Sequence, residues 1–582
     1  MNDLQDATVL VLGLGESGLA MARWCARRGA SVRVWDSRVR PANEAALAEH
    51  VPSASRVHGP LTEAAFAGVT LVLKSPGLSP QDAAIAATLK RLKDAGVPVR
   101  GELDLFAQAL RVLKAERGYA PKVLAITGTN GKTTTTAMAA MLIARTAKRV
   151  AVAGNIGPTM LQTLADALDL ASAVDAPLDL HPDLHPGRDT PTEAGWAEVA
   201  ADEPPLGDEA DPADPADAAP MQPVPPTRAA PVFEHLPEVW VLELSSFQLD
   251  DVQGFEPSAA AVLNITQDHL DWHGAMSHYI AAKACVFGHQ AVMVINRDDA
   301  RVEALVPAPE VVKGPKGKRA TTISRRVVRF GTGAPTRPGD FGIVDENGMT
   351  WLVRARELDE TLARGKGGKG SREHATESEE LLIQRLMPAD ALRVRGRHNA
   401  TNALAALALA TAIDCPLAPM LHGLREYAGE PHRVQYIGSI DGIDAYDDSK
   451  GTNVGATIAA LHALGSDKAP GKLVVILGGD GKGQDFAPLA VPVQRHARAV
   501  ATIGRDAASI ESALAGSAVL IQRFETLQAA TRWCFECGNK GDAVLLSPAC
   551  ASLDMFRGYA HRAEVFAAEV RAIVADRGGL AA

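Results

Sequence analysis

The segment LAITGTNGKTTTTAM, which begins at Leu124, constrains the fold of this chain more than any other feature. An apolar run ends at Thr127, a turn with two glycines follows, and Lys132 opens a stretch of small residues that favours a helix. Backbone N–H groups in such a turn form a nest for anions, and the helix adds the positive end of its dipole. The order of strand, turn and helix therefore predicts a phosphate-binding loop in a parallel α/β sheet.

The loop departs from the commonest phosphate-loop pattern, because Ile126 stands where G-x-x-x-x-G-K-[ST] has its first glycine. The remaining residues suit the same task. We expect Lys132 to reach the outer phosphates of ATP and the Thr133 hydroxyl to contact Mg²⁺. The predicted nucleotide-binding residues of the loop are Gly128, Thr129, Asn130, Gly131, Lys132, Thr133 and Thr134.

Charge is distributed unevenly along the 582 residues. The chain has a net charge of −10, but residues 166–234 alone hold 16 acidic and two basic side chains, and the remainder is close to neutral. A near-neutral body lacks the basic stripe typical of nucleic-acid binding. The sequence shows no apolar run of about 18 residues, and its N-terminus lacks the basic region of a signal peptide. We expect a cytoplasmic monomer with reduced cysteines and neither nucleic-acid partners nor membrane insertion.

Composition and hydrophobic pattern divide the chain into three α/β units. We place them at residues 1–115, 116–391 and 392–582, each with apolar, β-rich runs that alternate with helical patterns, as in parallel sheets covered by helices. The acidic, proline-rich stretch at about 166–234 cannot build a core and is predicted to be a poorly ordered insertion. A polar, Gly/Lys-rich stretch at about 363–380 is predicted to be a loop. We expect hinges near residues 118 and 392.

The form GTNGKTT resembles the Mur ligase superfamily, whose members use ATP to form an amide bond through an acyl phosphate. The resemblance covers nearly the whole chain outside the two predicted insertions. It implies an N-terminal Rossmann-like domain that binds a UDP-linked substrate and a central ATPase domain with a parallel sheet. It also implies a C-terminal Rossmann-like domain that delivers the amine.

A second group of polar residues follows the phosphate loop in the sequence. Glu243, in VWVLELSSFQL, ends an apolar strand, where a carboxylate beside a phosphate loop is a candidate ligand of Mg²⁺. The run DHLDWH leaves a zinc site open as an alternative, through Asp268, His269, Asp271 and His273. The family resemblance instead implies two Mg²⁺ ions held by Thr133, Glu243, His269 and a carbamylated Lys283.

The first unit opens with a glycine turn, GLGESG, which is followed by a strand and Asp36. Taken alone, this pattern fits an NAD-dependent oxidoreductase, although G-x-G-x-x-G is a weak signal. The resemblance implies instead that the turn binds a UDP-sugar. The residues then expected to contact that substrate are Gly15, Glu16, Ser17, Asp36, Ser37, Arg38, Ser75, Pro76, Gly77 and Asn155.

The last unit carries the residues expected to complete the site. The resemblance places Asn399 and Asn402 near adenine, Arg433 near the γ-phosphate, and Asp448, with Lys450 close by, facing the nucleotide. The stretches DDSKGTNVGAT, LGGDGKGQDF and LLSPACASLDMF resemble family members that add D-glutamate. By this likeness, the residues that hold D-glutamate are Thr452, Lys482, Ser552, Leu553 and Tyr559.

The expected reaction joins D-glutamate to UDP-N-acetylmuramoyl-L-alanine during the synthesis of peptidoglycan precursors. Lys132, His269, Lys283 and Arg433 are the predicted catalytic residues. A ligase that adds another amino acid, an oxidoreductase and a non-catalytic nucleotide-binding module remain as alternatives at this point.

Overall fold

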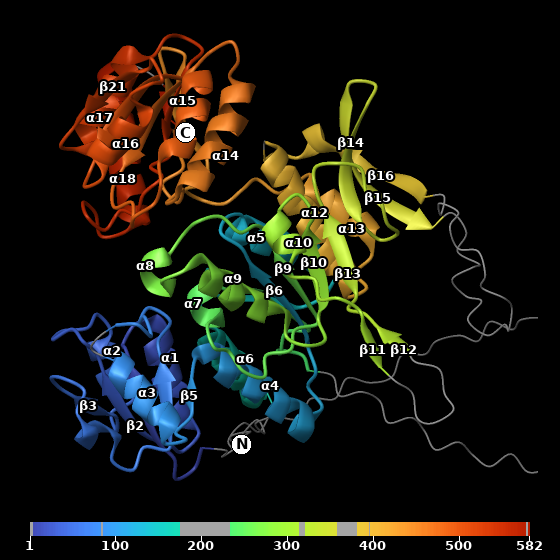
Figure 1. Ribbon diagram of the computed structural model, residues 1–582, viewed down its shortest axis with the longest axis vertical. Helices are drawn as coiled ribbons and strands as arrows, with labels where there is room; N and C mark the ends of the chain where they lie inside the picture. The colour runs from blue at the N-terminus through green and yellow to red at the C-terminus, as the bar shows by residue number, and fades with distance from the viewer. Residues whose placement is uncertain are drawn as a thin grey trace, which may run out of the picture.

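The computed structural model describes residues 4–82, 85–174, 233–312, 321–357, 381–394, 396–577 and 580–581. Within these ranges the chain forms three α/β units that succeed one another along the sequence. The N-terminal unit lies at one end of the molecule, the central unit in the middle and the C-terminal unit at the other end (Figure 1). The expected fold class, three α/β domains built on parallel sheets, is confirmed.

The N-terminal unit is a five-stranded parallel sheet in the doubly wound order β3-β2-β1-β4-β5. Alternate residues of β1 face opposite sides: Val9 and Val11 pack with α1 and α4, whereas Leu10 and Leu12 pack with α3. The strands are β1 (Thr8–Leu12), β2 (Ser31–Trp35), β3 (Ser55–Val57), β4 (Leu71–Lys74) and β5 (Val99–Arg100). The helices are α1 (Glu16–Arg27), α2 (Glu44–His50), α3 (Ala86–Asp94), α4 (Glu102–Arg117) and the 3₁₀ turn η1 (Glu63–Phe66).

The central unit places the strand before the phosphate loop in the middle of a six-stranded parallel sheet, in the order β13-β10-β9-β6-β8-β7. Ligand-binding groups in such sheets gather at the carboxyl ends of the strands, which is where the loop after β6 lies. The strands are β6 (Lys122–Thr127), β7 (Val150–Gly154), β8 (Val239–Glu243), β9 (Ala259–Val262), β10 (Val292–Asn296) and β13 (Val327–Phe330).

Helices cover both faces of this sheet. Leu124 and Ile126 of β6 pack with one set of helices, and Val123 and Ala125 pack with another. The first set is α5 (Lys132–Ala144), α12 (Arg397–Ala412) and α13 (Leu417–Leu424); the second includes α4, α6 (Met160–Val174) and α9 (Met276–Ala284). Shorter helical elements are α7 (Ser246–Leu249), α8 (Leu270–His273), η2 (Cys285–Phe287), α10 (Ala300–Glu303) and η3 (Ala389–Ala391).

Two small antiparallel sheets extend the central unit. One pairs β11 (Glu310–Val312) with β12 (Thr321–Ile323), and the other joins β14 (Phe341–Glu346), β15 (Met349–Glu357) and β16 (Leu381–Pro388).

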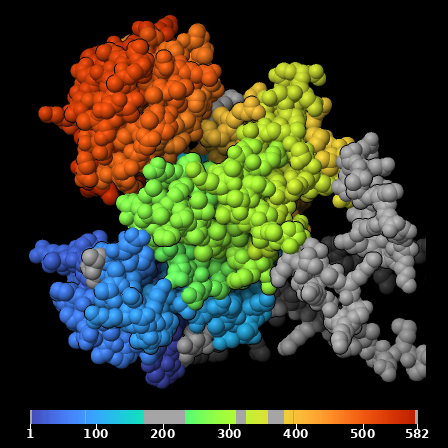
Figure 2. Space-filling model, viewed as in Figure 1, coloured from blue at the N-terminus to red at the C-terminus, as the bar shows by residue number. Residues whose placement is uncertain are grey.

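The C-terminal unit is a seven-stranded sheet in the order β21-β20-β19-β22-β18-β17-β23, in which β17 pairs antiparallel with both of its neighbours, β18 and β23. It forms its own lobe above the central unit in Figure 2. The strands are β17 (Gln435–Ile440), β18 (Ile443–Asp447), β19 (Leu473–Gly478), β20 (Ala497–Ile503), β21 (Leu520–Arg523), β22 (Ala543–Leu546) and β23 (Leu580–Ala581). The helices are α14 (Val454–Asp467), α15 (Ala490–His496), α16 (Ala507–Leu514), α17 (Leu527–Cys537), α18 (Tyr559–Arg577) and η4 (Ala487–Leu489).

The expected boundary at residue 392 differs from the structure. Leu404, Leu407 and Leu409 of α12 are fully buried in one cluster with Leu124 of β6. The helices α12 and α13 thus belong to the central unit, and the C-terminal sheet begins at Gln435. The alanine- and leucine-rich pattern predicted the helix but not the sheet against which it packs. The chain therefore crosses between the two units at 425–431 rather than near 392, since His432 already bonds to Asp447 of the C-terminal sheet.

The predicted acidic insertion also begins later than residue 166. The helix α6 continues to Val174, and Leu168 lies buried in the core shared by the first two units. Residues 175–232 of the predicted insertion and the predicted loop at 363–380 lie outside the described residues. In the described part of the chain, no helix combines the length and apolarity that a bilayer crossing requires. All six cysteines are free thiols, including Cys534 and Cys537 of the CxxC pattern.

The boundary after α13 can be tested with two fragments. A fragment of residues 1–431 keeps α12 and α13, so we expect it to unfold cooperatively on heating. A fragment of residues 1–391 lacks three fully buried leucines, each of which contributes roughly 1.5–3 kcal/mol. We therefore expect the shorter fragment to aggregate or to lack a cooperative melting transition in circular dichroism. Equal stability of the two fragments would contradict the assignment of α12 to the central core.

Candidate functional site

The phosphate loop follows β6 and requires glycine at position 131, directly before α5. Gly131 has a φ of 81°, in the left-handed region, and directly precedes α5. A Cβ atom at this position would lie 2.6 Å from Oδ1 of Asn402, so any side chain here would clash with α12. Asn402, expected near adenine, therefore lies against the loop, and its amide donates to Oδ1 of Asn399 at 3.3 Å.

The segment after β9 holds the loop in shape, which the sequence did not reveal. The Asn130 N–H donates to Oδ1 of Asn264 at 2.8 Å, and the Asn264 amide donates back to the Asn130 carbonyl at 3.0 Å. The Thr129 hydroxyl donates to the Thr266 carbonyl at 3.1 Å. Asn264 and Thr266 lie in NITQ, and a polar residue two positions after the end of a buried strand was the available signal.

Two lysines, the half-buried Lys132 and the buried Lys283, point at the loop carbonyls. Lys132 Nζ donates to the carbonyls of Gly128 and Thr129, both at 2.9 Å. Lys283 Nζ, on α9, donates to the Gly128 carbonyl at 2.8 Å and to the Thr127 hydroxyl at 3.3 Å. Burial, and for Lys283 the nearby Lys132 charge, lowers the pKa of both ammonium groups, that of Lys283 well below its usual value.

Two cations of the C-terminal unit reach the same loop from the other side. Arg433 donates to the Thr133 hydroxyl at 3.0 Å, and Lys450 Nζ donates to it at 3.1 Å. Burial and the Arg433 charge lower the pKa of Lys450 to about 8. The loop thus collects positive groups from two units, as a site for a polyanion such as a nucleotide triphosphate requires.

Glu243 provides an oxygen that suits a hard cation. The residue ends β8 and is 1% exposed, and its Oε1 accepts a hydrogen bond from the Asn155 amide at 2.7 Å. Its other oxygen, Oε2, is buried without a hydrogen-bond partner among the described residues. Such an orphaned carboxylate oxygen is costly unless a cation or a water molecule meets it. The orphaned oxygen of Glu243 therefore fits a Mg²⁺ ion, which Glu243 and the Thr133 hydroxyl would hold.

The zinc alternative does not match the structure. In the described residues, no group of three or more His, Cys, Asp or Glu side chains converges to hold a metal. His273 is buried, and its Nε2 lies 2.9 Å from the Ser246 hydroxyl. His269 instead stands beside Asp268, with its Nε2 3.5 Å from an Asp268 carboxylate oxygen. Burial lowers the pKa of His269 to about 4, against the opposing charge of Asp268, so its ring is neutral at pH 7 and able to ligate a metal.

Asp448 is the buried carboxylate of the C-terminal unit next to these cations. Its Oδ2 accepts a hydrogen bond from the Ser547 hydroxyl at 2.6 Å. Burial raises the pKa of Asp448 to about 7, although the Ser547 bond and the Arg433 charge oppose this effect.

The glycine turn of the N-terminal unit is organised by Asp36. The Leu14 N–H donates to Oδ2 of Asp36 at 2.7 Å, and Arg38 donates to both carboxylate oxygens. These bonds outweigh the effect of burial and lower the pKa of Asp36 to about 2. The Ser75 hydroxyl donates to the Gly13 carbonyl at 2.8 Å, which joins the two predicted substrate segments.

The other residues expected at the substrate surround this turn. Gly15 caps α1, Glu16 and Ser17 form its first turn, and Ser37 and Gly77 are exposed. With Asp36 bonded to Leu14 and Arg38, the turn differs from the dinucleotide pattern, in which the acid is left to meet a ribose.

The residues expected to hold D-glutamate lie on loops of the C-terminal unit, except Tyr559, which begins α18. Ser552 is buried, whereas Leu553 and Tyr559 are 74% and 39% exposed. Lys482 has a φ of 50° and lies close enough to His269 for its charge to lower the pKa of that ring. Thr452 lies two residues after Lys450, and Lys450 Nζ lies 5.5 Å from the centre of the Tyr559 ring.

Arg562, which no pattern in the sequence indicated, joins two loops of this unit. Its guanidinium is fully buried and donates to the Ser449 carbonyl at 2.8 Å and to the Cys550 carbonyl at 3.1 Å. An arginine on an amphipathic helix gives no sequence signal of such a role.

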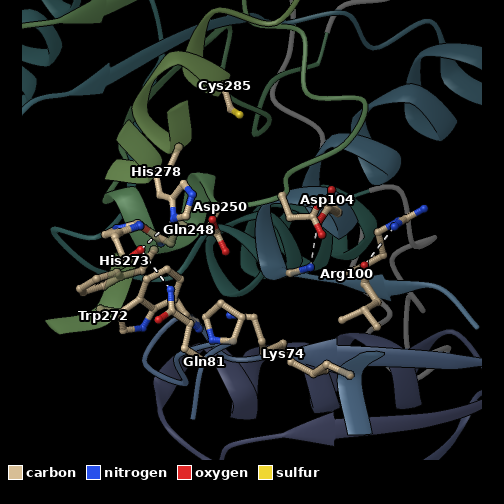
Figure 3. Close-up of a pocket in the computed structure, with 18 of the residues that line it drawn as sticks. Lys74, Gln81, Arg100, Asp104, Gln248, Asp250, Trp272, His273, His278 and Cys285 are labelled. Atoms are coloured by element: carbon tan, nitrogen blue, oxygen red, sulfur yellow. Dashed lines mark hydrogen bonds between the residues drawn. The ribbon is translucent and has the colours of Figure 1, made fainter. Parts of the chain in front are cut away.

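A cleft of about 650 Å³ separates the N-terminal unit from α7, α8 and α9 (Figure 3). Pro76 is the predicted substrate residue that lines it, together with Lys74 on the same unit and Trp272 and Asp250 on the opposite wall. The two walls meet where the Gln81 amide donates to the His273 carbonyl at 3.1 Å. The cleft adjoins the Ser75–Gly77 segment that is expected to contact the UDP-substrate.

Comparison with known proteins agrees with this arrangement. Three family models match the chain: "Mur ligase MurD-like, N-terminal domain" at 7–101, "Mur ligase middle domain" at 126–182 and 228–330, and "Mur ligase, glutamate ligase domain" at 432–550. A solved structure, UDP-N-acetylmuramate-alanine ligase from Thermotoga maritima, aligns with a TM-score of 0.50 at 17% identity over 97% of this chain and 99% of that one, which shows a shared fold.

The chain belongs to the Mur ligase family, and the expectation that it is a ligase is confirmed. Among its relatives, the UDP-N-acetylmuramoylalanine–D-glutamate ligase of Albidiferax ferrireducens is 50% identical over 99% of this chain and 98% of that protein. The ligase of the same name from Paraburkholderia phymatum is 48% identical over 99% of this chain and 98% of that protein.

The raised pKa of Asp448 predicts a pH-dependent stability. A carboxyl group with a higher pKa in the folded than in the unfolded state loses stability as the pH rises from about 4 to about 7. We expect Asp448→Asn to be more stable than the parent protein by about 2–4 kcal/mol at pH 8, and this gain to vanish near pH 4.

Thermal melting of the ligand-free protein across this pH range measures the effect. The matched control is Asp441→Asn, at an exposed carboxylate of the same unit. A gain from Asp448→Asn that does not grow with pH would contradict the burial of an ionisable group at this position.

Proposed function

We propose that this chain adds D-glutamate to UDP-N-acetylmuramoyl-L-alanine in an ATP-dependent reaction that forms ADP and phosphate, in the synthesis of peptidoglycan precursors. The contact of Arg433 and Lys450 with Thr133 carries the proposal. It brings the C-terminal unit, which is expected to bind the amino acid, onto the phosphate loop. The names of the relatives that are 48–50% identical over nearly the full length support the choice of amino acid and acceptor.

The chain's own groups account for phosphoryl transfer to a carboxylate. The loop N–H groups and Lys132 bind the outer phosphates of ATP, and Arg433 meets the charge that develops on the γ-phosphoryl group. The terminal alanine carboxylate of the UDP-substrate attacks this phosphorus in line with the departing ADP. The resulting acyl phosphate carries a good leaving group, so the amine of D-glutamate displaces phosphate to form the amide.

Mg²⁺, bound through Glu243 and Thr133, would supply charge neutralisation between the outer phosphates. A second Mg²⁺ at His269 and a carbamate on Lys283 are part of the proposal. Burial and the Lys132 charge lower the pKa of Lys283 well below its usual value, which favours the neutral amine, the form that reacts with CO₂. The carbamate would replace a cation beside Lys132 with an anion able to meet a metal.

Exclusion of water is the main demand on the site, because acyl phosphates hydrolyse. The C-terminal unit covers the loop from one side, and the N-terminal unit borders the cleft of Figure 3 on the other. We further propose that the protein acts as a cytoplasmic monomer.

Phosphate release tests this function directly. With ATP, Mg²⁺ and UDP-N-acetylmuramoyl-L-alanine, we expect release to depend on D-glutamate and not on L-glutamate, L-alanine or diaminopimelate. Lys132→Ala should lower turnover by about two orders of magnitude or more, because it removes a preorganised charge at the outer phosphates.

The matched control is Lys122→Ala, an exposed lysine at the other end of β6, which should retain parent turnover. Release with another amino acid, or full turnover by Lys132→Ala, would refute the proposal.

A further inference from the structure

Asn453 connects the C-terminal unit to the phosphate loop by its side-chain amide. It lies directly before α14 and is 5% exposed. Its Nδ2 donates to Oδ1 of Asn130, in the loop, at 3.0 Å. The same Nδ2 donates to Oδ2 of Asp268, the neighbour of His269, at 3.3 Å. One amide group therefore touches the nucleotide loop and the residue beside the proposed metal ligand.

The orientation of this amide is fixed because its oxygen also caps helix α14. Oδ1 of Asn453 accepts the Ala456 N–H at 2.9 Å and thereby caps α14. Because the oxygen must face this N–H group, the NH₂ end must face Asn130 and Asp268. Asn130 is in turn held from its other side by Asn264. The amide cannot rotate without losing either the helix cap or the contact between the units.

Gly455 is independent evidence that α14 and the phosphate loop lie in close contact, because a side chain at this position would crowd the loop. A Cβ atom there would lie 3.1 Å from Nδ2 of Asn130 and 3.4 Å from the Thr266 hydroxyl. The first turn of α14 thus packs directly on the central unit, at the point where Asn453 bridges.

The hydrogen bonds of Asn453 matter for the reaction because the residues just before it are expected to contact the substrates. Lys450 reaches the Thr133 hydroxyl, and Thr452 is expected to hold D-glutamate. Both are within three residues of the bridge, so the position of the loop 450–453 over the phosphates depends on it. A shift of about 1 Å in reacting groups is enough to lower a rate by about 100-fold.

We propose that Asn453 is a positioning residue that fixes the loop 450–453 on the phosphate loop and so aligns amine delivery with the activated carboxylate. It acts through Asn130 and Asp268 and does not itself touch the reacting atoms. The inference rests on the proposed function for its kinetic part, whereas its structural part concerns the docking of the two units.

Two substitutions separate the bridge from the helix cap. Asn453→Asp keeps the capping oxygen but loses the NH₂ donor and sets a carboxylate against Asp268. Asn453→Ser also keeps a capping oxygen and is too short to bridge. We expect kcat to fall roughly 10- to 100-fold in both variants, since the hydrogen bonds to Asn130 and Asp268 are lost, and to fall more in Asn453→Asp, since a carboxylate then faces Asp268. The KM for D-glutamate should rise, while the Kd of the UDP-substrate stays within about twofold.

Small-angle scattering with a non-hydrolysable ATP analogue, recorded well below the melting temperature of each variant, measures the docking of the two units separately from the kinetics. The parent protein should be more compact than either variant. The matched control is Thr526→Ala, which removes the side-chain cap of α17 away from the site and should preserve both kcat and compactness.

Parent-like kinetics in both Asn453 variants, or lost kinetics with unchanged compactness, would overturn the inference. If the parent protein releases no phosphate with D-glutamate, the proposed function fails, but the scattering comparison still decides the role of Asn453.

Discussion

The structure depends on one electrostatic arrangement: a loop of bare backbone that is surrounded by four cations, with the carboxylates of Glu243 and Asp268 close enough to act on Lys132. Lys132 and Lys283 approach from the central unit, and Arg433 and Lys450 approach from the C-terminal unit. Like charges repel, and here each ammonium or guanidinium donates to a carbonyl or a hydroxyl, while nearby carboxylates oppose the repulsion. A bound triphosphate would exchange these local bonds for stronger, charge-assisted ones. The arrangement is therefore built for a polyanion.

The same arrangement makes the three units interdependent. The central sheet supplies the loop, and α12, which follows the two small antiparallel sheets in the sequence, packs beside it and places Asn402 against Gly131. The C-terminal unit adds cations and, through Asn453, a neutral bridge. The N-terminal unit borders the neighbouring cleft and is joined to α8 by backbone carbonyls of Trp272 and His273. A reaction with three substrates needs such convergence, because each unit brings one of them to the same few ångströms.

Much of this could be predicted from the sequence, because its strongest signals are local. Strand, glycine turn and lysine mark the phosphate loop, and the alternation of apolar runs with helical patterns gave the three α/β units. The boundary at 392 was misplaced because an apolar helix does not specify which sheet it covers. The start of the acidic insertion was misplaced because Leu168 belongs to a helix that continues into a biased composition.

The residues that sequence analysis missed share one property: their role depends on a partner that is distant in the chain. Asn264, Asn453 and Arg562 act through backbone groups or amides of other segments, 134, 323 and 113 residues away. No spacing rule describes such pairs. The zinc alternative at Asp268–His273 shows the opposite error, since residues close in sequence point to different partners, Asn453 and Ser246 among them.

The central claim is that the loop at residues 128–134 holds ATP so that its γ-phosphoryl group passes to a substrate carboxylate. It can be tested by labelling that carboxylate of the UDP-substrate with ¹⁸O and analysing the phosphate released with D-glutamate by mass spectrometry. Transfer through an acyl phosphate predicts one ¹⁸O atom in each released phosphate when the label is complete. Released phosphate that carries no label would contradict the account.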